Sequence, residues 1–251
     1  AGFEAAGLDA VYVPFEAVDA DDLMVLADAL GVAGLSVTAP FKESILDHVR
    51  HVDALGRQVG AVNTVRADHE GWVGLNTDVP GFLAPLDACG DPRGVRSTVL
   101  GAGGAARAVA VALASRGAKV TVCARRPERA AVVARLAGGT VGTLPPRAGS
   151  WDLLVNTTPI GTAPGITQTP VPAASLWGGK TVYDLVYNPG RTRLLREAAT
   201  AGCETIGGLD MLVAQAVRQF AWWSGTRPSA ELFRTAAVTA LGELGISRES
   251  V

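Results

Sequence analysis

Cysteine and histidine are scarce in this sequence, and their scarcity limits the chemistry that it can support. The 251 residues include 3 Cys and 3 His. Cys89, Cys123 and Cys203 are widely separated and form no Cys-x-x-Cys pair, which is typical of a reducing cytoplasm rather than of a disulfide framework. The histidines have no metal-ligand spacing with cysteines or carboxylates, so we predict no metal site.

Charged residues and long hydrophobic runs are also limited. Charged side chains make up 18% of the sequence and the formal net charge is −2, which argues against a nucleic-acid-binding surface. No apolar run approaches the roughly 20 residues of a membrane-spanning helix, and no signal peptide is recognisable. Because 48% of the residues are hydrophobic, we expect a well-buried core. The cysteine usage, the net charge and the absence of long apolar runs together predict a cytoplasmic protein with no nucleic-acid or membrane partner.

The most specific motif lies in residues 98–108, where an apolar strand is followed by a G-x-G-x-x-A turn and a helix-forming run. In a dinucleotide-binding turn, Gly101 permits the tight turn, Gly103 allows close approach of a pyrophosphate, and Ala106 lets the helix pack against the strand. The helix N-terminus then offers free N–H groups to the phosphates. The alternative is a glycine-rich connection without a ligand.

The next strand, Lys119–Cys123, favours the cofactor interpretation. An NAD-binding protein usually has Asp or Glu after this strand, whereas this sequence has Ala124, Arg125 and Arg126. Two guanidinium groups suit a 2′-phosphate, so the substitution predicts NADP. The alternative is a pair of solvated arginines before a helix that begins at Pro127.

Strands and helices alternate through the middle of the sequence, which predicts a parallel, doubly wound α/β sheet with right-handed crossovers. The expected strands cover residues 97–100, 119–123, 140–143, 152–155, 181–184 and 204–206. Two helices follow, one ending at Trp223 and one over Ser229–Leu241, and either cap the sheet or return to the first part of the chain.

The first part of the chain is expected to form a separate α/β unit. Its predicted strands are Val11–Phe15, Gly34–Thr38, Ala61–Arg66 and Gly71–Leu75, and its predicted helices cover residues 21–30, 43–48, 54–59 and 77–89. The chain opens at Ala1 rather than Met, in what resembles the middle of a helix.

Polar residues follow several of these strands. Lys42 comes after a buried strand that is stopped by Pro40, and ligands of open α/β sheets bind beyond the carboxyl ends of strands. Asn63 and Asp78 also lie at strand ends. A lysine and an aspartate beside a nicotinamide would form an alcohol/ketone site, with the ammonium donating a proton to the carbonyl oxygen.

Each of these segments also has a structural interpretation. Lys42 could be a surface lysine paired with Glu43 or Asp47 at a helix start. The run Asn76–Asp78 could be a helix N-cap.

Seven motifs in order resemble the shikimate dehydrogenase family across nearly all of the chain. They are Ser36–Lys42 (N-V-T-x-P-x-K in the family), Gly60–Thr64 (G-A-V-N-T), Asn76–Phe82 (N-T-D-x-x-G-F), Gly101–Ala108 (G-A-G-G-A-A-x-A), Asn156–Gly161 (N-A-T-P-x-G), Tyr183–Pro189 (Y-D-x-x-Y-x-P) and Gly207–Ala216 (G-x-x-M-L-V-x-Q-A).

The resemblance implies a two-domain α/β fold and an NADPH-dependent reduction of 3-dehydroshikimate to shikimate, in aromatic amino acid biosynthesis. A substrate domain would comprise residues 1–77 and 208–251, and a Rossmann NADP-binding domain residues 78–207. The C-terminal helices would return to the substrate domain. The expected partner is the small-molecule substrate, and the protein would be a monomer or a homodimer.

The resemblance also implies the roles of individual residues. Lys42 and Asp78 would be the catalytic pair. The substrate hydroxyls or carboxylate would be held by Thr38, Asn63, Tyr187 and Gln215. The cofactor would be bound by Gly101, Ala102, Gly103, Gly104, Ala105, Ala106, Ala124, Arg125, Arg126, Asn156, Thr157, Thr158, Leu185 and Gly208.

The sequence departs from the family in several places. Ser36 replaces Asn, Val79 replaces Gly, and Ala124 and Arg126 replace the outer residues of an N-R-T motif. The family's first strand and its substrate-binding Ser-x-Ser stretch would precede Ala1, so we expect a fragment rather than a defective copy, one whose parent could carry a fused dehydroquinase domain. The alternatives are a quinate or aminoshikimate enzyme, which could use NAD, and a non-catalytic NADP-binding remnant.

Overall fold

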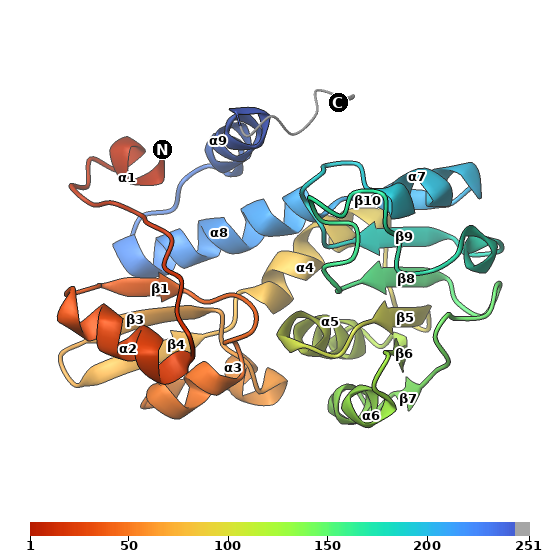
Figure 1. Ribbon diagram of the computed structural model, residues 1–251, viewed down its shortest axis with the longest axis horizontal. Helices are drawn as coiled ribbons and strands as arrows, with labels where there is room; N and C mark the ends of the chain where they lie inside the picture. Colours follow the sequence, from red (N-terminus) through yellow and green to blue (C-terminus); the bar gives the residue numbers. More distant parts are fainter. Residues whose placement is uncertain (244–251) are drawn as a thin grey trace.

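The computed structural model describes residues 1–243 and contains two β-sheets that lie side by side (Figure 1). The smaller sheet has four strands in the order β1-β3-β4-β2, with bounds Gly34–Ser36 (β1), Thr64–Asp68 (β3), Gly71–Leu75 (β4) and His51–Val52 (β2). Strands β1, β3 and β4 pair antiparallel, and β2 pairs parallel to β4. The polar run Asp68–Gly71 forms the tight connection between β3 and β4.

The larger sheet has six strands, all parallel, in the order β10-β9-β8-β5-β6-β7. Their bounds are Arg96–Leu100 (β5), Lys119–Cys123 (β6), Thr140–Val141 (β7), Leu153–Asn156 (β8), Thr181–Asp184 (β9) and Glu204–Ile206 (β10). The predicted parallel α/β sheet is therefore confirmed. The strand order reverses between β5 and β8, and ligands of such sheets bind at the carboxyl ends of the strands beside this reversal.

Helices cover both sheets and build three hydrophobic clusters. Helix α5 (Gly104–Ser115) is rich in Ala and Val, and its buried face packs against β5 and β6 in the largest cluster. The other helices of the larger sheet are α4 (Asp78–Leu86), α6 (Pro127–Leu136) and α7 (Arg193–Thr200), with short 3-10 helices at Asp87–Cys89 (η2) and Ala173–Leu176 (η3). Helix α2 (Ala20–Ala29) packs on the smaller sheet next to the 3-10 helix η1 (Ser44–His48), whereas α3 (Ala54–Val59) packs against α5 and β4.

The C-terminal helices return to the smaller sheet, as predicted. Helix α8 (Gly208–Ser224) follows β10 and runs back across the molecule (Figure 1). Gln219 Nε2 donates to the carbonyl of Asn63 at 3.1 Å, and Trp223 Nε1 donates to the carbonyl of Val65 at 2.9 Å. Helix α9 (Ala230–Glu243) packs on α8 through Phe220 and Phe233, beside the short helix α1 (Gly2–Ala5). Residues 244–251, which end the predicted substrate domain, lie outside the described residues.

The predicted strand Val11–Phe15 is wrong. This segment is extended but has no strand partner within residues 1–243, and the side chain of Val11 is 84% exposed. A run of apolar residues identifies a segment that can pair, but pairing requires a neighbouring strand edge, and β1 pairs only with β3 among the described strands.

Two smaller predictions also need correction near the smaller sheet. The helix expected over residues 43–48 is the 3-10 helix η1, and β3 begins at Thr64 rather than Ala61. The strand begins late because Val62 N donates to the carbonyl of Lys42 at 2.8 Å instead of entering the ladder with β4. This bond draws the chain before Asn63 toward Lys42.

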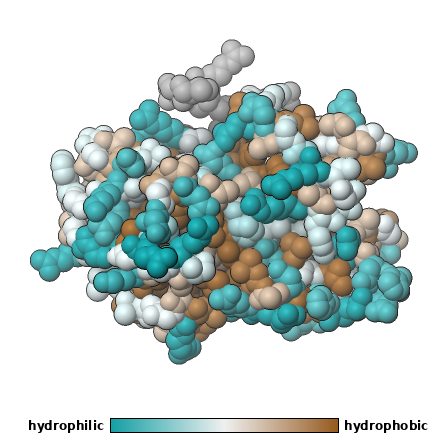
Figure 2. Space-filling model, turned by 180° about the vertical axis from the view of Figure 1, so that it is seen from behind, coloured by the Kyte–Doolittle hydropathy of each residue, from teal (hydrophilic) through white to brown (hydrophobic). Residues whose placement is uncertain are grey.

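The surface of the molecule is mixed in character. Seen from behind, it is largely hydrophilic or neutral, with hydrophobic residues gathered mainly toward the middle of the face (Figure 2). No helix within residues 1–243 has the length and apolar content needed to cross a membrane.

Candidate active site

Lys42 and Asp78 form an ion pair between the two sheets. Lys42 lies in the turn that follows β1. Asp78 is the first residue of α4, and two residues separate it from the end of β4. Lys42 Nζ is 2.7 Å from Asp78 Oδ2, and the two side chains are 16% and 5% exposed. The structure thus brings together the two residues that the sequence predicts as a catalytic pair. The surface-lysine alternative fails, because Lys42 pairs with neither Glu43 nor Asp47 in the described residues.

Asn63 fixes the orientation of the Asp78 carboxylate. Its Nδ2 donates to Asp78 Oδ1 at 2.9 Å and to Thr77 Oγ1 at 2.9 Å, while its Oδ1 accepts from Thr77 N at 2.8 Å. Both carboxylate oxygens of Asp78 are therefore engaged, one by an amide and the other by the ammonium of Lys42. A carboxylate held in this way keeps one oxygen directed at Lys42.

The start of α4 is capped by Asn76. Its Oδ1 accepts from Val79 N at 3.1 Å, and its Nδ2 donates to the carbonyl of Ala61 at 2.9 Å. The helix-cap alternative is thus correct for Asn76 but not for Asp78. Because Asn76 supplies the cap, the Asp78 carboxylate is available to Lys42.

The glycine turn adjoins Lys42. Gly101 has φ 118°, which favours glycine, and a Cβ there would collide with Thr157 Oγ1. Gly103, the N-cap of α5, has an ordinary φ of −100° and open space where a Cβ would stand. A Cβ on Gly104 would lie 3.0 Å from Lys42 Cβ. The stem of Lys42 therefore rests on the first residue of the helix that follows the turn.

Arg125 and Arg126 lie at the same edge of the sheet as this turn. They follow β6, whose last residue, Cys123, pairs with Leu100 and accepts at its carbonyl from Gly101 N at 2.9 Å. Both side chains are exposed, and within residues 1–243 neither has a carboxylate at ion-pair distance. Two guanidinium groups without a carboxylate partner, beside the glycine turn, fit a phosphate in addition to the pyrophosphate, as the 2′-phosphate of NADP would be.

A buried network shapes the loops that follow β8 and β9. Asn156 Nδ2 donates to Asp184 Oδ1 at 2.9 Å, and Thr192 Oγ1 donates to Asp184 Oδ2 at 2.6 Å. Asn156 Oδ1 accepts from Thr158 Oγ1 at 2.7 Å, and Thr157 Oγ1 donates to the carbonyl of Leu100 at 2.7 Å. The side chain of Asn156 is completely buried, so its contribution to the predicted cofactor site is to hold the loop.

The carboxyl group of Asp184 lies deep in the protein. Burial raises its pKa above the ordinary value, opposed by hydrogen bonds from Thr192, Val186 N and Asn156. An aspartate as the last residue of an apolar strand is the sequence signal for Asp184, which is not among the predicted site residues.

The loop after β9 contacts the start of α8. Gly208 is buried, and a Cβ there would collide with the carbonyl of Leu185.

Tyr183, in strand β9, is a buried phenol that stacks on Phe82 at a ring-centroid distance of 5.0 Å. Its hydroxyl has no hydrogen-bond partner among the described residues. Burial therefore raises the pKa of Tyr183, so this phenol stays neutral.

Three predicted substrate-binding residues are not joined to the Lys42–Asp78 pair by hydrogen bonds within residues 1–243. Thr38 is exposed in the turn before Lys42, and Tyr187 is 42% exposed in the loop after β9. Gln215 lies on α8, where its Nε2 donates to the carbonyl of Leu212 at 3.0 Å and its Cβ faces Gly81. Their roles stay predictions.

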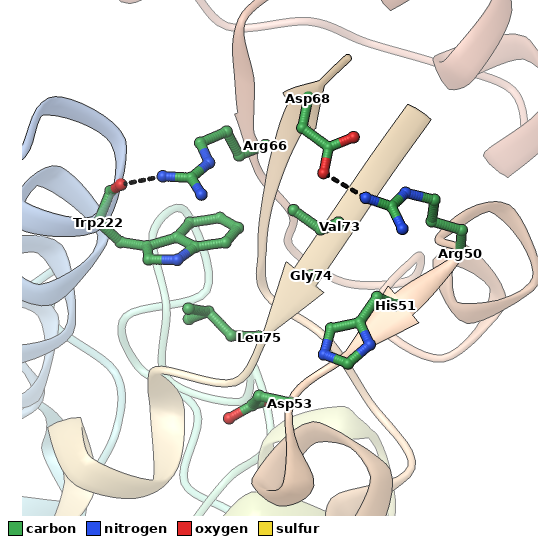
Figure 3. A pocket seen from close by; sticks show the side chains of 9 residues that line it. All are labelled: Arg50, His51, Asp53, Arg66, Asp68, Val73, Gly74, Leu75 and Trp222. Carbon is green, nitrogen blue, oxygen red and sulfur yellow. Dashed lines mark hydrogen bonds and ion pairs between the residues drawn. The ribbon is translucent and has the colours of Figure 1, made fainter. Parts of the chain in front are cut away.

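A separate pocket of about 360 Å³ lies on the part of the smaller sheet that α8 leaves uncovered (Figure 3). It is lined by Arg50, His51, Asp53, Arg66, Asp68, Val73, Gly74, Leu75 and Trp222. Arg50 pairs with Asp68 at 2.6 Å, and Arg66 stacks over the Trp222 ring at 4.5 Å (Figure 3). No predicted site residue lines this pocket, and its charges are largely balanced within it.

Known proteins resemble the chain over almost its whole length. A family model described as the shikimate dehydrogenase substrate binding domain matches residues 1–65, and one described as the shikimate 5'-dehydrogenase C-terminal domain matches residues 208–238. Shikimate dehydrogenase (NADP(+)) of Methanosarcina mazei is 42% identical over 257 residues, covering 96% of this chain and 91% of the relative. The chain belongs to the shikimate dehydrogenase family.

Solved structures of this family have the same fold. Shikimate 5-dehydrogenase from Thermus thermophilus, in complex with NADP(H) and shikimate, matches with a TM-score of 0.84 and 36% identity, covering 95% of this chain and 91% of that one. The ligand-free 5-ketofructose reductase of Gluconobacter sp. strain CHM43 matches with a TM-score of 0.80 and 34% identity, covering 97% and 91%. The fold of the shikimate dehydrogenase family therefore also occurs in a protein named as a reductase of 5-ketofructose.

Proposed function

We propose that this protein catalyses the NADPH-dependent reduction of 3-dehydroshikimate to shikimate, a step of aromatic amino acid biosynthesis. The observation that carries the proposal is the Lys42–Asp78 ion pair, with the stem of Lys42 resting on Gly104 beside the glycine turn. A proton donor thus adjoins the place where a dinucleotide would bind. The name of the M. mazei relative supplies the substrate and the cofactor.

The proton chemistry is assigned to Lys42 Nζ. When bound, NADPH supplies the hydride that reduces the ketone carbon. Lys42 donates a proton to the carbonyl oxygen as negative charge develops there, and Asp78 stabilises the ammonium form and directs it. Asn63 holds Asp78 in place through its 2.9 Å hydrogen bond, and we propose that it also faces the substrate, with Thr38, Tyr187 and Gln215.

The cofactor is assigned to the edge of the larger sheet where the strand order reverses. The backbone of Gly101–Ala106 would hold the pyrophosphate, and Ala124–Arg126 would hold the 2′-phosphate. The nicotinamide side would be bordered by Asn156–Thr158, Leu185 and Gly208. We assign residues 1–77 and 208–251 to a substrate domain and residues 78–207 to the cofactor domain. A cytoplasmic monomer or homodimer is part of the same proposal.

The test is an assay of NADPH oxidation with a panel of ketones. We expect turnover with 3-dehydroshikimate to exceed that with 3-dehydroquinate and 5-ketofructose in kcat/KM by at least tenfold. The quinate alternative predicts the reverse order for the first two compounds, and the 5-ketofructose reductase match motivates the third. NADPH binding without turnover of any ketone would instead indicate a non-catalytic NADP-binding protein.

Two glycine substitutions should separate folding from cofactor binding. Gly103→Ala places a methyl group in open space and leaves φ allowed, so the melting temperature should change little. The same methyl would face an approaching pyrophosphate, so NADP affinity should fall at least tenfold. Gly101→Ala forces a positive φ and a collision with Thr157, and should lower stability by about 1–3 kcal/mol. Titration calorimetry and thermal melts measure both effects, and unchanged NADP affinity in Gly103→Ala would contradict the assignment.

A further inference from the structure

Arg107 lies where helix α5 contacts the end of α3 and residues 42–43, and this contact region is called the seam below. It is one helical turn beyond Gly104, and its side chain is only 15% exposed. The guanidinium crosses to α3, where Nε donates to the carbonyl of Val59 at 2.9 Å. Val59 ends α3, so this bond places a cation at the C-terminus of that helix, where cations are favoured.

The neighbour of Val59 leaves room for Arg107. Gly60 adopts the left-handed conformation at the end of α3, with φ 65°, and a Cβ there would collide with the Arg107 guanidinium. Two independent requirements, backbone angle and space, therefore call for glycine at this position. The arrangement shows that Arg107 is fitted into the seam rather than lying on the surface.

Arg107 also contacts the residue next to Lys42. Its Nη1 is 3.7 Å from Glu43 Oε2, while the stem of Lys42 rests on Gly104. The neighbouring residues Lys42 and Glu43 thus contact α5 at Gly104 and at Arg107, one helical turn apart. The carbonyl of Lys42 accepts from Val62 N at 2.8 Å, which ties the segment to the chain that leads to Asn63.

We infer that Arg107 is a positioning residue that sets Lys42 Nζ at a fixed place relative to the glycine turn. The inference rests on the proposed function in assigning proton transfer to Lys42. Arg107 forms no hydrogen bond or ion pair with Lys42 or Asp78 within residues 1–243, and it acts by holding α5 against residues 42–43 and against the end of α3. Small displacements of a reacting group cost large factors in rate, so loosening this seam should slow the chemical step more than it weakens binding.

The first test is a double-mutant cycle. Arg107→Met should lower kcat at least tenfold and change KM for NADPH and for 3-dehydroshikimate less than threefold. In a Lys42→Ala background the same substitution should lower kcat less than twofold, because there is no ammonium left to position. Arg107→Lys should recover part of kcat, since it keeps a cation near Glu43. Equal losses in both backgrounds would assign Arg107 to folding alone.

The matched control is Arg116→Met. Arg116 follows the same helix and pairs with Asp87 at 2.9 Å, away from Lys42. It should leave kcat unchanged within twofold. A drop equal to that of Arg107→Met would show that any disturbance of α5 has this effect, and would overturn the inference.

The second test does not need turnover. The sequence contains three lysines, Lys42, Lys119 and Lys180, so acetylation of each can be followed by peptide mass spectrometry. Lys42 should react at least fivefold faster in Arg107→Met than in the unmodified protein, with and without bound NADP. Lys180, whose side chain is 78% exposed, should react at the same rate in both.

The two tests separate the inference from the proposed function. If the unmodified protein reduces no ketone, the proposed function fails, and the labelling of Lys42 still decides whether Arg107 holds this side chain. An unchanged rate of Lys42 labelling in Arg107→Met would overturn the inference even if the enzyme reduces 3-dehydroshikimate.

Discussion

Replacing Lys42 with alanine is expected to lower kcat for 3-dehydroshikimate reduction by about 10²–10⁴-fold, the usual worth of a positioned general acid. The ammonium lies 2.7 Å from Asp78, and alanine leaves no proton donor at position 42. NADPH affinity should change little, because only the stem of Lys42 touches the glycine turn, at Gly104. Steady-state kinetics and a fluorescence titration of NADPH measure the two quantities.

Asp78→Ala provides the companion experiment. If Lys42 and Asp78 act as one unit, the double variant should lose much less than the product of the two single losses. Lys180→Ala is the control for loss of a lysine, since Lys180 lies on the surface near Asp152 and should retain full activity. Strictly multiplicative losses for Lys42→Ala and Asp78→Ala would mean that the ion pair plays no joint part in the reaction.

The parallel sheet could be predicted from the sequence because strands and helices alternate through this part of the chain and the central strands, such as β5 and β8, are buried apolar runs. All six of its strands were placed within about two residues. Continuous burial marks the central strands clearly, whereas the edge strands β7 and β10 are largely exposed. The segment Val11–Phe15 has the same local pattern but no partner strand in the described chain. Local pattern predicts which segments can be strands, whereas pairing depends on which edges meet in space.

In the candidate site too, the local sequence pattern predicts some features, whereas contacts between distant segments could not be predicted. The meeting of Lys42 with Asp78 could be expected because both follow strands, and the resemblance to a family indicated the pair directly. A helix cap within the run Asn76–Asp78 could be expected, but not which of the three residues supplies it. The role of Arg107 as a bridge could not be expected. Arg107 bonds Val59 from 48 positions away in the sequence, and one arginine in an alanine-rich helix gives no sign of where it points.

The second large effect concerns the choice of cofactor. Arg125→Ala should weaken NADP binding by about 1.5–3 kcal/mol, the scale of a hydrogen bond to a charged group, which is a factor of about ten to one hundred in Kd. NAD affinity should barely move, because NAD lacks the 2′-phosphate. The expectation follows from two exposed guanidinium groups after β6, with no carboxylate at ion-pair distance in residues 1–243.

Arg129→Ala is the matched control for the loss of a positive charge. Arg129 is exposed on α6, one turn beyond the strand end, and should not reach a phosphate held at Arg125. Its removal should therefore change NADP affinity less than threefold, and raising the salt concentration should reduce even that difference. Kd values for NADP and NAD, measured by calorimetry for the three proteins, test the expectation. Equal losses of NADP and NAD affinity in Arg125→Ala would place Arg125 elsewhere on the cofactor, and equal kcat/KM with both cofactors in the unmodified enzyme would contradict the NADP preference itself.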